Sequence, residues 1–174
     1  MTYKYSYQKS EENTARAVLL DAPISTKQSI EVCSKLRTKT VEYAKKFLEG
    51  VKKKEKAVKY TRFTEGAGHK KGIGPGKYPI KTAGYILKLV QSAESNATSK
   101  GLGSDLKIVH LSAQRASTPW HQGRLRRRKM KRSHIELVVQ EITHKTSKKQ
   151  ESTKQEIQNK DTKEKQAEKK EDKK

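Results

Sequence analysis

The chain has 174 residues, which is enough for one domain and little more. Lys and Arg number 41 against 19 acidic residues, which gives a formal net charge of +22, and only 31% of the residues are hydrophobic. This charge favours nucleic acid as the partner, because each cation docked on a phosphate releases a condensed counterion. A single cysteine excludes an internal disulfide, and no stretch approaches the roughly 20 apolar residues of a membrane span. We therefore expect a cytoplasmic protein with no membrane partner.

The first twenty residues favour extended backbone. Tyr3, Tyr5 and Tyr7 alternate with polar residues. Such alternation is typical of a strand, although three tyrosines also fit a basic-aromatic arm that stacks on bases. We expect an extended N-terminal segment, followed near Ala15–Leu20 by a strand or a turn.

Two amphipathic helices are expected next. Ser25 with Gln28 three positions later predicts a capping box at the start of the first helix, and Thr40 can cap the second. Both apolar faces follow helical spacing, and they consist of Ile30, Cys33 and Leu36 in the first helix and of Val41, Ala44, Leu48 and Val51 in the second. Cys33 is interpreted as a small core residue rather than a nucleophile, because no base is evident near it.

A segment rich in glycine and basic residues follows at 58–78. It does not match a P-loop, because Gly76 and Lys77 are followed by Tyr78 rather than by Ser or Thr. We expect a flexible loop whose backbone lies close to phosphates; a plain surface loop is the alternative. Its predicted RNA contacts are Arg62, His69, Lys70, Lys71 and Lys77, with the charge of Lys59 beside them. Whether the lysine run at 52–56 also contacts RNA stays open.

The longest helical pattern starts after Pro79, which fits a first helical turn because its missing N–H costs nothing there. The apolar positions repeat at spacings of three and four, and they are Ala83, Ile86, Val90, Ala93 and Ala97. Gly101 suits a C-terminal cap. This face is predicted to belong to the hydrophobic core.

After Gly103 the pattern changes to alternation, which predicts two strands and a long hairpin over residues 106–142. In the first strand we expect Leu106, Ile108 and His110 on one face and Val109, Leu111 and Ala113 on the other. In the second strand, Ile135, Leu137 and Val139 share a face.

The residues between these strands are almost entirely polar or basic, so no core can hold them. Residues 124–132 carry seven positive charges and no negative one. If residues 114–133 continue as a paired ribbon that turns near 121–123, it extends roughly 30 Å at about 3.3 Å per residue. An isolated ribbon is marginal in water, so we expect it to order against a partner.

Arginine suits this partner, because its planar guanidinium binds phosphate with two hydrogen bonds and stacks on bases. The predicted RNA contacts of the hairpin are Arg115, Arg124, Arg126, Arg127, Arg128, Lys129, Lys131 and Arg132. A solvated loop or a nuclear-localisation run is the alternative. Trp120 fits stacking on a base and packing against the hairpin's own limb equally well.

The sequence gives no sign of catalysis. Its five histidines are scattered and its one cysteine cannot complete a zinc site, so we expect neither a metal nor a cofactor. No Ser-His-Asp set or carboxylate pair can be nominated, so we expect no catalytic residue and no enzyme. The last thirty residues, 145–174, hold eleven lysines, seven acids and almost no apolar side chain, which predicts a disordered tail after a domain at 1–144.

Several motifs together resemble a known family. They are Pro23-Ile24-Ser25, Phe63 with Gly68-His69-Lys70-Lys71-Gly72, Gly76-Lys77-Tyr78-Pro79, Ala93-Glu94-Ser95-Asn96-Ala97 with Lys100-Gly101-Leu102, and His134-Ile135-Glu136-Leu137-Val138. The chain resembles the universal large-subunit ribosomal protein family numbered twenty-two in bacteria and seventeen in eukaryotes, in its archaeal or eukaryotic form. The resemblance covers roughly residues 15–141.

The resemblance implies an α+β fold, with three helices packed on a small antiparallel sheet and a long basic hairpin. It implies a non-catalytic protein that binds large-subunit rRNA and neighbouring ribosomal proteins and supports subunit assembly. The hairpin then runs along the nascent-peptide exit tunnel, with a tip at Trp120, His121, Gln122 and Gly123 that faces the peptide. Between Ala113 and His134 this chain is shorter than the resemblance leads us to expect.

Two other functions compete with this one. A free RNA- or DNA-binding regulator would use the same basic arm, and it would be stable and folded away from any ribosome. An RNA-modifying enzyme is the third class, but the sequence offers no cofactor motif for it.

Overall fold

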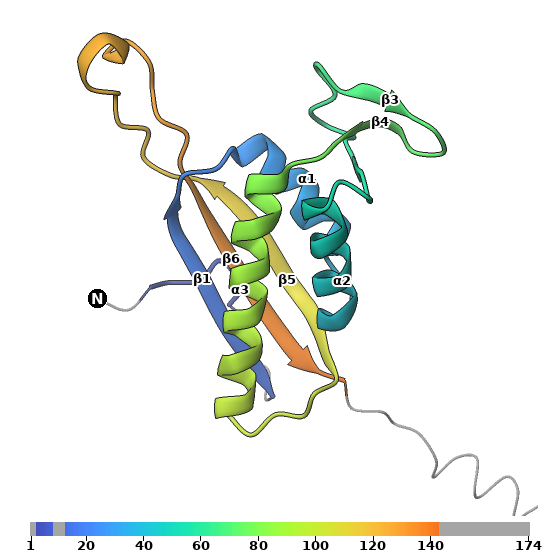
Figure 1. Cartoon of the computed structure of the whole chain (residues 1–174). Helices are drawn as coiled ribbons and strands as arrows, with labels where there is room; N and C mark the ends of the chain where they lie inside the picture. The colour runs from blue at the N-terminus through green and yellow to red at the C-terminus, as the bar shows by residue number, and fades with distance from the viewer. Residues whose placement is uncertain (1–2, 9–12, 143–174) are drawn as a thin grey trace, which may run out of the picture. The chain divides into compact units, whose positions relative to one another are not determined.

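The computed structural model describes residues 3–8 and 13–142 (Figure 1). The expected α+β class is confirmed, because these residues form three α-helices and two small antiparallel sheets. The tail predicted at 145–174 lies outside the described residues. None of the described helices combines the length and the apolar character that crossing a membrane requires.

The larger sheet contains β1 (Thr14–Ala22), β5 (Leu106–Arg115) and β6 (Ser133–Glu141). Its order is β1-β6-β5, so β6 is the central strand and pairs with both neighbours in antiparallel register. Leu137 of β6, for example, lies between Ala17 and Leu111. The strand expected near residues 15–20 and the hairpin that joins the last two strands are both confirmed.

All three helices cover one face of this sheet (Figure 1). They are α1 (Thr26–Leu36), α2 (Val41–Lys52) and α3 (Ile80–Ser99). Thr40 caps α2 as predicted, since its Oγ1 accepts a hydrogen bond from the Tyr43 N–H at 3.3 Å. Gly101 follows the end of α3 with a φ of +74°, the left-handed conformation that glycine adopts without strain.

The capping box predicted at the start of α1 is wrong. Ser25 does occupy the N-cap position, but its side chain makes no capping hydrogen bond. The Gln28 side chain accepts a hydrogen bond from Thr82 of α3 instead of returning to the helix start. The first-turn N–H groups of α1 therefore lack a capping side chain.

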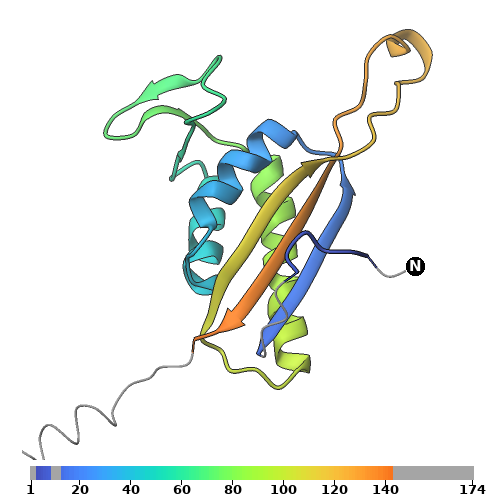
Figure 2. The same cartoon turned by 180° about the vertical axis from the view of Figure 1, so that it is seen from behind.

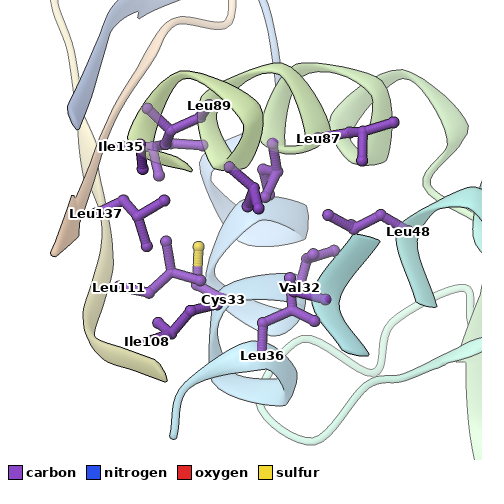
Figure 3. Packing of buried hydrophobic residues seen from close by; sticks show 14 of the residues in the cluster. Val32, Cys33, Leu36, Leu48, Leu87, Leu89, Ile108, Leu111, Ile135 and Leu137 are labelled. Atoms are coloured by element: carbon purple, nitrogen blue, oxygen red, sulfur yellow. The ribbon is translucent and has the colours of Figure 1, made fainter. Parts of the chain in front are cut away.

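The hydrophobic core lies between the helices and the sheet (Figure 3). Every position of the predicted α3 face is buried. Cys33 is buried in this core, as its place in the apolar stripe of α1 predicted. Burial raises the pKa of its thiol to about 12, so this cysteine stays protonated.

The side-chain alternation predicted for β5 is wrong beyond Ile108. A β-bulge between Ile108 and His110 shifts the register against β6. As a result Leu106 and Ile108 before the bulge and Leu111 after it all reach the core, while His110 faces away from it. The predicted shared face of Ile135, Leu137 and Val139 is confirmed.

The face of the sheet opposite the helices is crossed by the N-terminal segment, residues 3–8 (Figure 2). Glu136, in the centre of β6, holds this segment. Its carboxylate accepts hydrogen bonds from the Tyr3 hydroxyl at 2.6 Å, the Ser6 N–H at 2.9 Å and the Ser6 hydroxyl at 2.5 Å. Tyr7 stacks on His110, with ring centroids 5.4 Å apart. The central strand is therefore covered on both faces.

The segment expected to be a flexible loop forms a second sheet instead. It contains β2 (Val58–Lys59), β3 (Gly68–Lys70) and β4 (Gly74–Lys77) in the order β2-β4-β3. Val58 is buried in the core and anchors the sheet to the domain. The basic residues of this segment are consequently held by a folded sheet rather than by a flexible loop.

Candidate nucleic-acid interface

The arm, residues 116–132, joins β5 to β6 and carries most of the predicted contacts. Its two limbs are held by three backbone hydrogen bonds, from Ala116 N to Arg132 O (3.3 Å), from Met130 N to Pro119 O (2.7 Å) and from His121 N to Arg128 O (2.8 Å). It turns through η1 (Gly123–Leu125), close to the predicted turn. The limbs are thus paired only in part.

The prediction of a continuous ribbon is therefore wrong. Arg115 pairs with Ser133. A strict continuation of that register would pair Trp120 with Arg128, but the observed bridge joins Trp120 to Lys129. The register therefore shifts by one residue between these two pairs, and Pro119 has no N–H to donate to a hydrogen bond between the limbs. The arm is a partly paired loop with a defined turn.

The predicted cations of the hairpin face solvent. Arg115, Arg124, Arg126, Arg127, Arg128, Lys129 and Lys131 are exposed, and Arg132 is half-buried. Within residues 3–8 and 13–142, the ion pairs involve none of them. Concentrated positive charge without internal carboxylates is the electrostatic signature of a polyanion-binding surface.

Trp120 combines the two arrangements that the sequence left open. Its ring packs against the opposite limb, with the Lys129 Nζ 4.7 Å from the ring centroid. The side chain is nevertheless 55% exposed, so one part of the ring is available to a partner. Gln122 and Gly123 at the tip are exposed, and His121 is half-buried.

Where the arm meets the domain there is a groove of about 470 Å³, which we name the arm-base groove. Its lining consists of Ser25, Thr26, Lys27, Arg115, Thr118, Lys129, Met130, Lys131 and Arg132. Five of these residues are cations and none is acidic. Like charges that converge without a carboxylate repel one another, so an anion in the groove is electrostatically favoured.

Hydrogen bonds fix the shape of this groove. The Arg132 Nη1 donates to the Asp21 carbonyl oxygen at 2.9 Å. The hydroxyls of Thr26 and Ser133 lie 2.8 Å apart, and the Ser133 hydroxyl donates to the Ile24 carbonyl oxygen at 3.1 Å. The base of the arm is therefore attached to the start of α1.

Sequence reasoning missed Lys27. A signal was present, because Lys27 lies in the first turn of α1, where the helix dipole disfavours a cation. An anion bound close to this helix start would offset the repulsion. In the structure Lys27 lines the arm-base groove, and its Nζ lies 5.6 Å from the centroid of the Phe63 ring.

Glu31 of α1 fixes the segment that leads into the small sheet. Its buried carboxylate accepts hydrogen bonds from the backbone N–H groups of Thr61 (3.2 Å), Arg62 (2.8 Å) and Phe63 (2.9 Å), and from the Thr61 hydroxyl (3.2 Å). Burial alone would raise the pKa of Glu31, but these hydrogen bonds lower it by a larger amount. Its pKa therefore lies below the usual value. The charged carboxylate thus fixes the backbone of residues 61–63 against α1.

The predicted cations of the small sheet divide into two groups. Arg62, His69 and Lys71 are exposed. Lys70 and Lys77 also hold the segment itself: Lys70 Nζ lies 5.1 Å from the Tyr78 ring centroid, and Lys77 Nζ donates to the Glu65 carbonyl oxygen at 2.7 Å. The structure therefore unites Lys27 with the arm-base cations in one groove, whose lining includes none of the predicted cations of the small sheet. No cluster of three or more metal-ligating side chains occurs in the described part of the chain.

Comparison with known proteins gives a consistent result. Residues 17–140 match the family model described as ribosomal protein L22p/L17e. The large ribosomal subunit protein uL22 of Ignicoccus hospitalis is 37% identical over 156 residues, which is 81% of this chain and 98% of that protein. The uL22 proteins of Staphylothermus marinus (36% over 154 residues; 81% and 98%) and Methanosphaera stadtmanae (38% over 147 residues; 79% and 96%) are similarly close.

Proposed function

The chain belongs to the ribosomal protein L22p/L17e family, and from this premise we propose that its arm, arm-base groove and small sheet are the surfaces with which it binds rRNA. It is a structural protein of the large ribosomal subunit in the cytoplasm, and it takes part in translation. Its partners are ribosomal components, rRNA and neighbouring ribosomal proteins.

The observation that carries the assignment of the surfaces is the arm-base groove, with its five cations and no acid. Guanidinium and ammonium groups that converge on one groove can dock a phosphate backbone, and each contact releases a counterion. The exposed arginines of the arm extend this surface, and Arg62, His69 and Lys71 supply a second contact region beyond α1. Residues 1–144 act as the rRNA-binding domain, and residues 145–174 as a charged tail.

The protein acts by binding alone. Its two buried carboxylates serve structural purposes, since Glu31 and Glu136 are occupied by backbone and hydroxyl donors. In assembly it neutralises phosphates and holds rRNA segments together, without catalysing a reaction and without a cofactor. Binding energy of this kind is strongly salt-dependent.

The tip of the arm lies beside the nascent peptide in the exit tunnel. In support, Trp120 is 55% exposed, and Gln122 and Gly123 are exposed as well. The tip therefore makes few contacts with the rest of the domain. An arm that is only partly paired in isolation gains its final order from the rRNA around it. The path of the surrounding rRNA then determines how far the arm extends into the tunnel.

Sedimentation tests the assignment. The tagged full chain should co-sediment with large subunits through a gradient and should leave them only in high salt. Its absence from the large-subunit peak, together with specific binding to short nucleic acids, would favour the free regulator instead. Cross-links from Trp120 to the nascent peptide in stalled ribosomes would support the place of the tip, and cross-links from Trp120 to the subunit surface alone would contradict it.

A further inference from the structure

A second groove lies on another part of the domain, between the α1–α2 side and the small sheet. It has a volume of about 460 Å³, and we name it the α2 groove. Its apolar lining includes Tyr43 and Phe47 of α2 and Ile73 from the turn between β3 and β4. None of the three was among the predicted contacts, and none lines the arm-base groove.

The aromatic pair in this groove has a defined geometry. Tyr43 and Phe47 are one helical turn apart, and their rings stack with centroids 6.1 Å apart and planes inclined by 13°. Phe47 is buried, whereas Tyr43 is 40% exposed. The buried ring supports the exposed one, so a partner that stacks on Tyr43 loses little side-chain entropy.

Three lysines line the same groove as the aromatic pair. Lys35 comes from α1, Lys56 lies before β2 and Lys59 is in β2; all three are exposed. The Lys56 stem lies across Gly50 of α2, where a Cβ would stand 3.0 Å from the Lys56 Cδ. Glu55 is the single acid of the lining, so the cations are in excess.

We propose that the α2 groove binds an unpaired RNA nucleotide, with its base stacked on Tyr43 and its flanking phosphates on Lys35, Lys56 and Lys59. The proposal rests on the proposed function, because the RNA in question is the rRNA of the subunit. An exposed aromatic ring in a groove lined by cations is the combination that binds single-stranded nucleic acid, since every base offers a π-face and every nucleotide a phosphate.

Charge complementarity favours RNA over a protein partner here. The centre of a protein–protein interface is depleted in charged residues, and lysine in particular is under-represented. The α2 groove instead places three lysines against two aromatic rings.

The deciding measurement is the affinity of the full chain for a transcript of the large-subunit rRNA. Replacing Tyr43 by Leu should weaken binding by about 5-fold to 100-fold, the range that loss of one base–aromatic stack produces. Tyr43→Phe keeps the ring and should retain the affinity. Because 40% of the Tyr43 side chain is exposed and leucine keeps an apolar group over Phe47, neither variant should change the melting temperature of the protein by more than a small shift, which circular dichroism checks.

The salt dependence of rRNA binding distinguishes the contribution of the Tyr43 ring from that of the three lysines. Tyr43→Leu should leave the slope of log affinity against log salt unchanged, whereas Lys35→Gln, Lys56→Gln and Lys59→Gln should each reduce it by about 0.7 for a lost contact to a single strand. Lys46→Gln is the matched control, because Lys46 is an exposed lysine of α2 outside the groove lining. The affinity of this control variant and its slope against salt should equal those of the natural chain.

Ultraviolet cross-linking of purified large subunits identifies the occupant. The tryptic peptide Thr40–Lys45, which contains Tyr43, should carry a nucleotide adduct. A Tyr43→Leu variant that binds rRNA within twofold of the natural chain overturns the proposal, and so does a cross-link from this peptide to another protein. If arm variants still weaken rRNA binding in that case, the proposed function stands; if the natural chain itself fails to bind rRNA, the proposed function fails as well.

Discussion

Two buried carboxylates hold segments that have little core of their own. Glu31 binds the start of the small sheet, and Glu136 binds the N-terminal segment. Both are almost completely buried, yet hydrogen bonds keep the pKa of each below its usual value. At residue scale, the basic surface of this protein is therefore shaped by a few acids, which attract backbone donors rather than the cations of the surface.

Replacing Glu31 by Gln should destabilise the protein by about 1.5–3 kcal/mol, the range for hydrogen bonds to a charged group. The amide oxygen can take the place of Oε1 and accept from the N–H groups of Thr61, Arg62 and Phe63, but it carries no full charge. The amide NH₂ then replaces Oε2, so the hydrogen bond that the Thr61 hydroxyl donates to the carboxylate is lost. Urea denaturation measures the loss, and amide hydrogen exchange at Arg62 and Phe63 should become faster. Glu49→Gln, at an exposed position of α2, is the control; equal midpoints for the two variants would contradict the prediction.

Glu136 should make the stability depend on pH. Burial raises the pKa of its carboxyl, but the donors from Ser6 and Tyr3 and the nearby His110 lower it more, so its folded pKa lies below the ordinary 4.5. The stabilisation is then complete above the unfolded pKa and is lost as the pH falls through the lower folded pKa. Glu136→Gln should reduce the free energy of unfolding at pH 7, and its difference from the natural chain should shrink below about pH 4.5. Denaturation at a series of pH values checks this, and a constant difference would refute it.

At the scale of elements, the arm should dominate the salt dependence of rRNA binding. Replacing Arg126, Arg127 and Arg128 by Ala should reduce the slope of log affinity against log salt by up to about 0.9 for each lost contact to a duplex. Replacing the same residues by Lys keeps the charge but loses the bidentate geometry, so the slope should stay while the affinity falls. Filter binding from low to high salt measures both. An unchanged slope in the alanine variant would mean that these arginines face solvent in the complex.

How well each element could be predicted depends on how local its cause is. The buried face of α3 follows from spacings of three and four within one segment, and all of its predicted positions are buried. The β5 bulge is set by pairing with β6, more than twenty residues away, so alternation alone gave the wrong face for His110. The small sheet was missed because its strands are only two to four residues long, and because β3 and β4 contain Gly or Pro in place of alternating apolar residues.

Prediction of the candidate site was limited in the same way, by how local the cause of each feature is. The cations of the arm were recognised from composition, because a charge run needs no tertiary information. Lys27 and Tyr43 were missed, since each acquires its role from segments distant in the sequence: Lys27 from the arm across the groove, and Tyr43 from the turn at Ile73. The docking of Ser6 on Glu136 spans 130 residues and has no local signal beyond the alternating tyrosines.

At the scale of the whole molecule, the folded core and the arm are separable. The free edges of the main sheet are covered from within the domain: Asn96 donates to the Arg16 carbonyl oxygen on β1, and the backbone of Thr38 and Lys39 pairs with Ile108 on β5. Both faces of β6 are covered as well, by the helices and by the N-terminal segment. Covered edges resist strand addition by other chains. The hydrophobic core cluster contains no residue of the arm, so the stability of the domain should not depend on the arm.

Removing the arm tests this separation. Residues 117–131 can be replaced by Asn-Gly, because the backbones of Ala116 and Arg132 are already joined by a 3.3 Å hydrogen bond and Asn-Gly favours a tight hairpin turn. The buried hydrophobic residue at the arm base, Ala116, is retained. The shorter loop costs less closure entropy, by about 0.6 kcal/mol for each halving of its length, so the unfolding free energy should stay equal or rise slightly. Affinity for rRNA and incorporation into large subunits should fall sharply, because four of the five arm arginines and four of the nine residues that line the arm-base groove are gone. A variant that fails to fold would show that the arm supports the core, and a variant that incorporates normally would show that the small sheet and the α2 groove suffice for assembly.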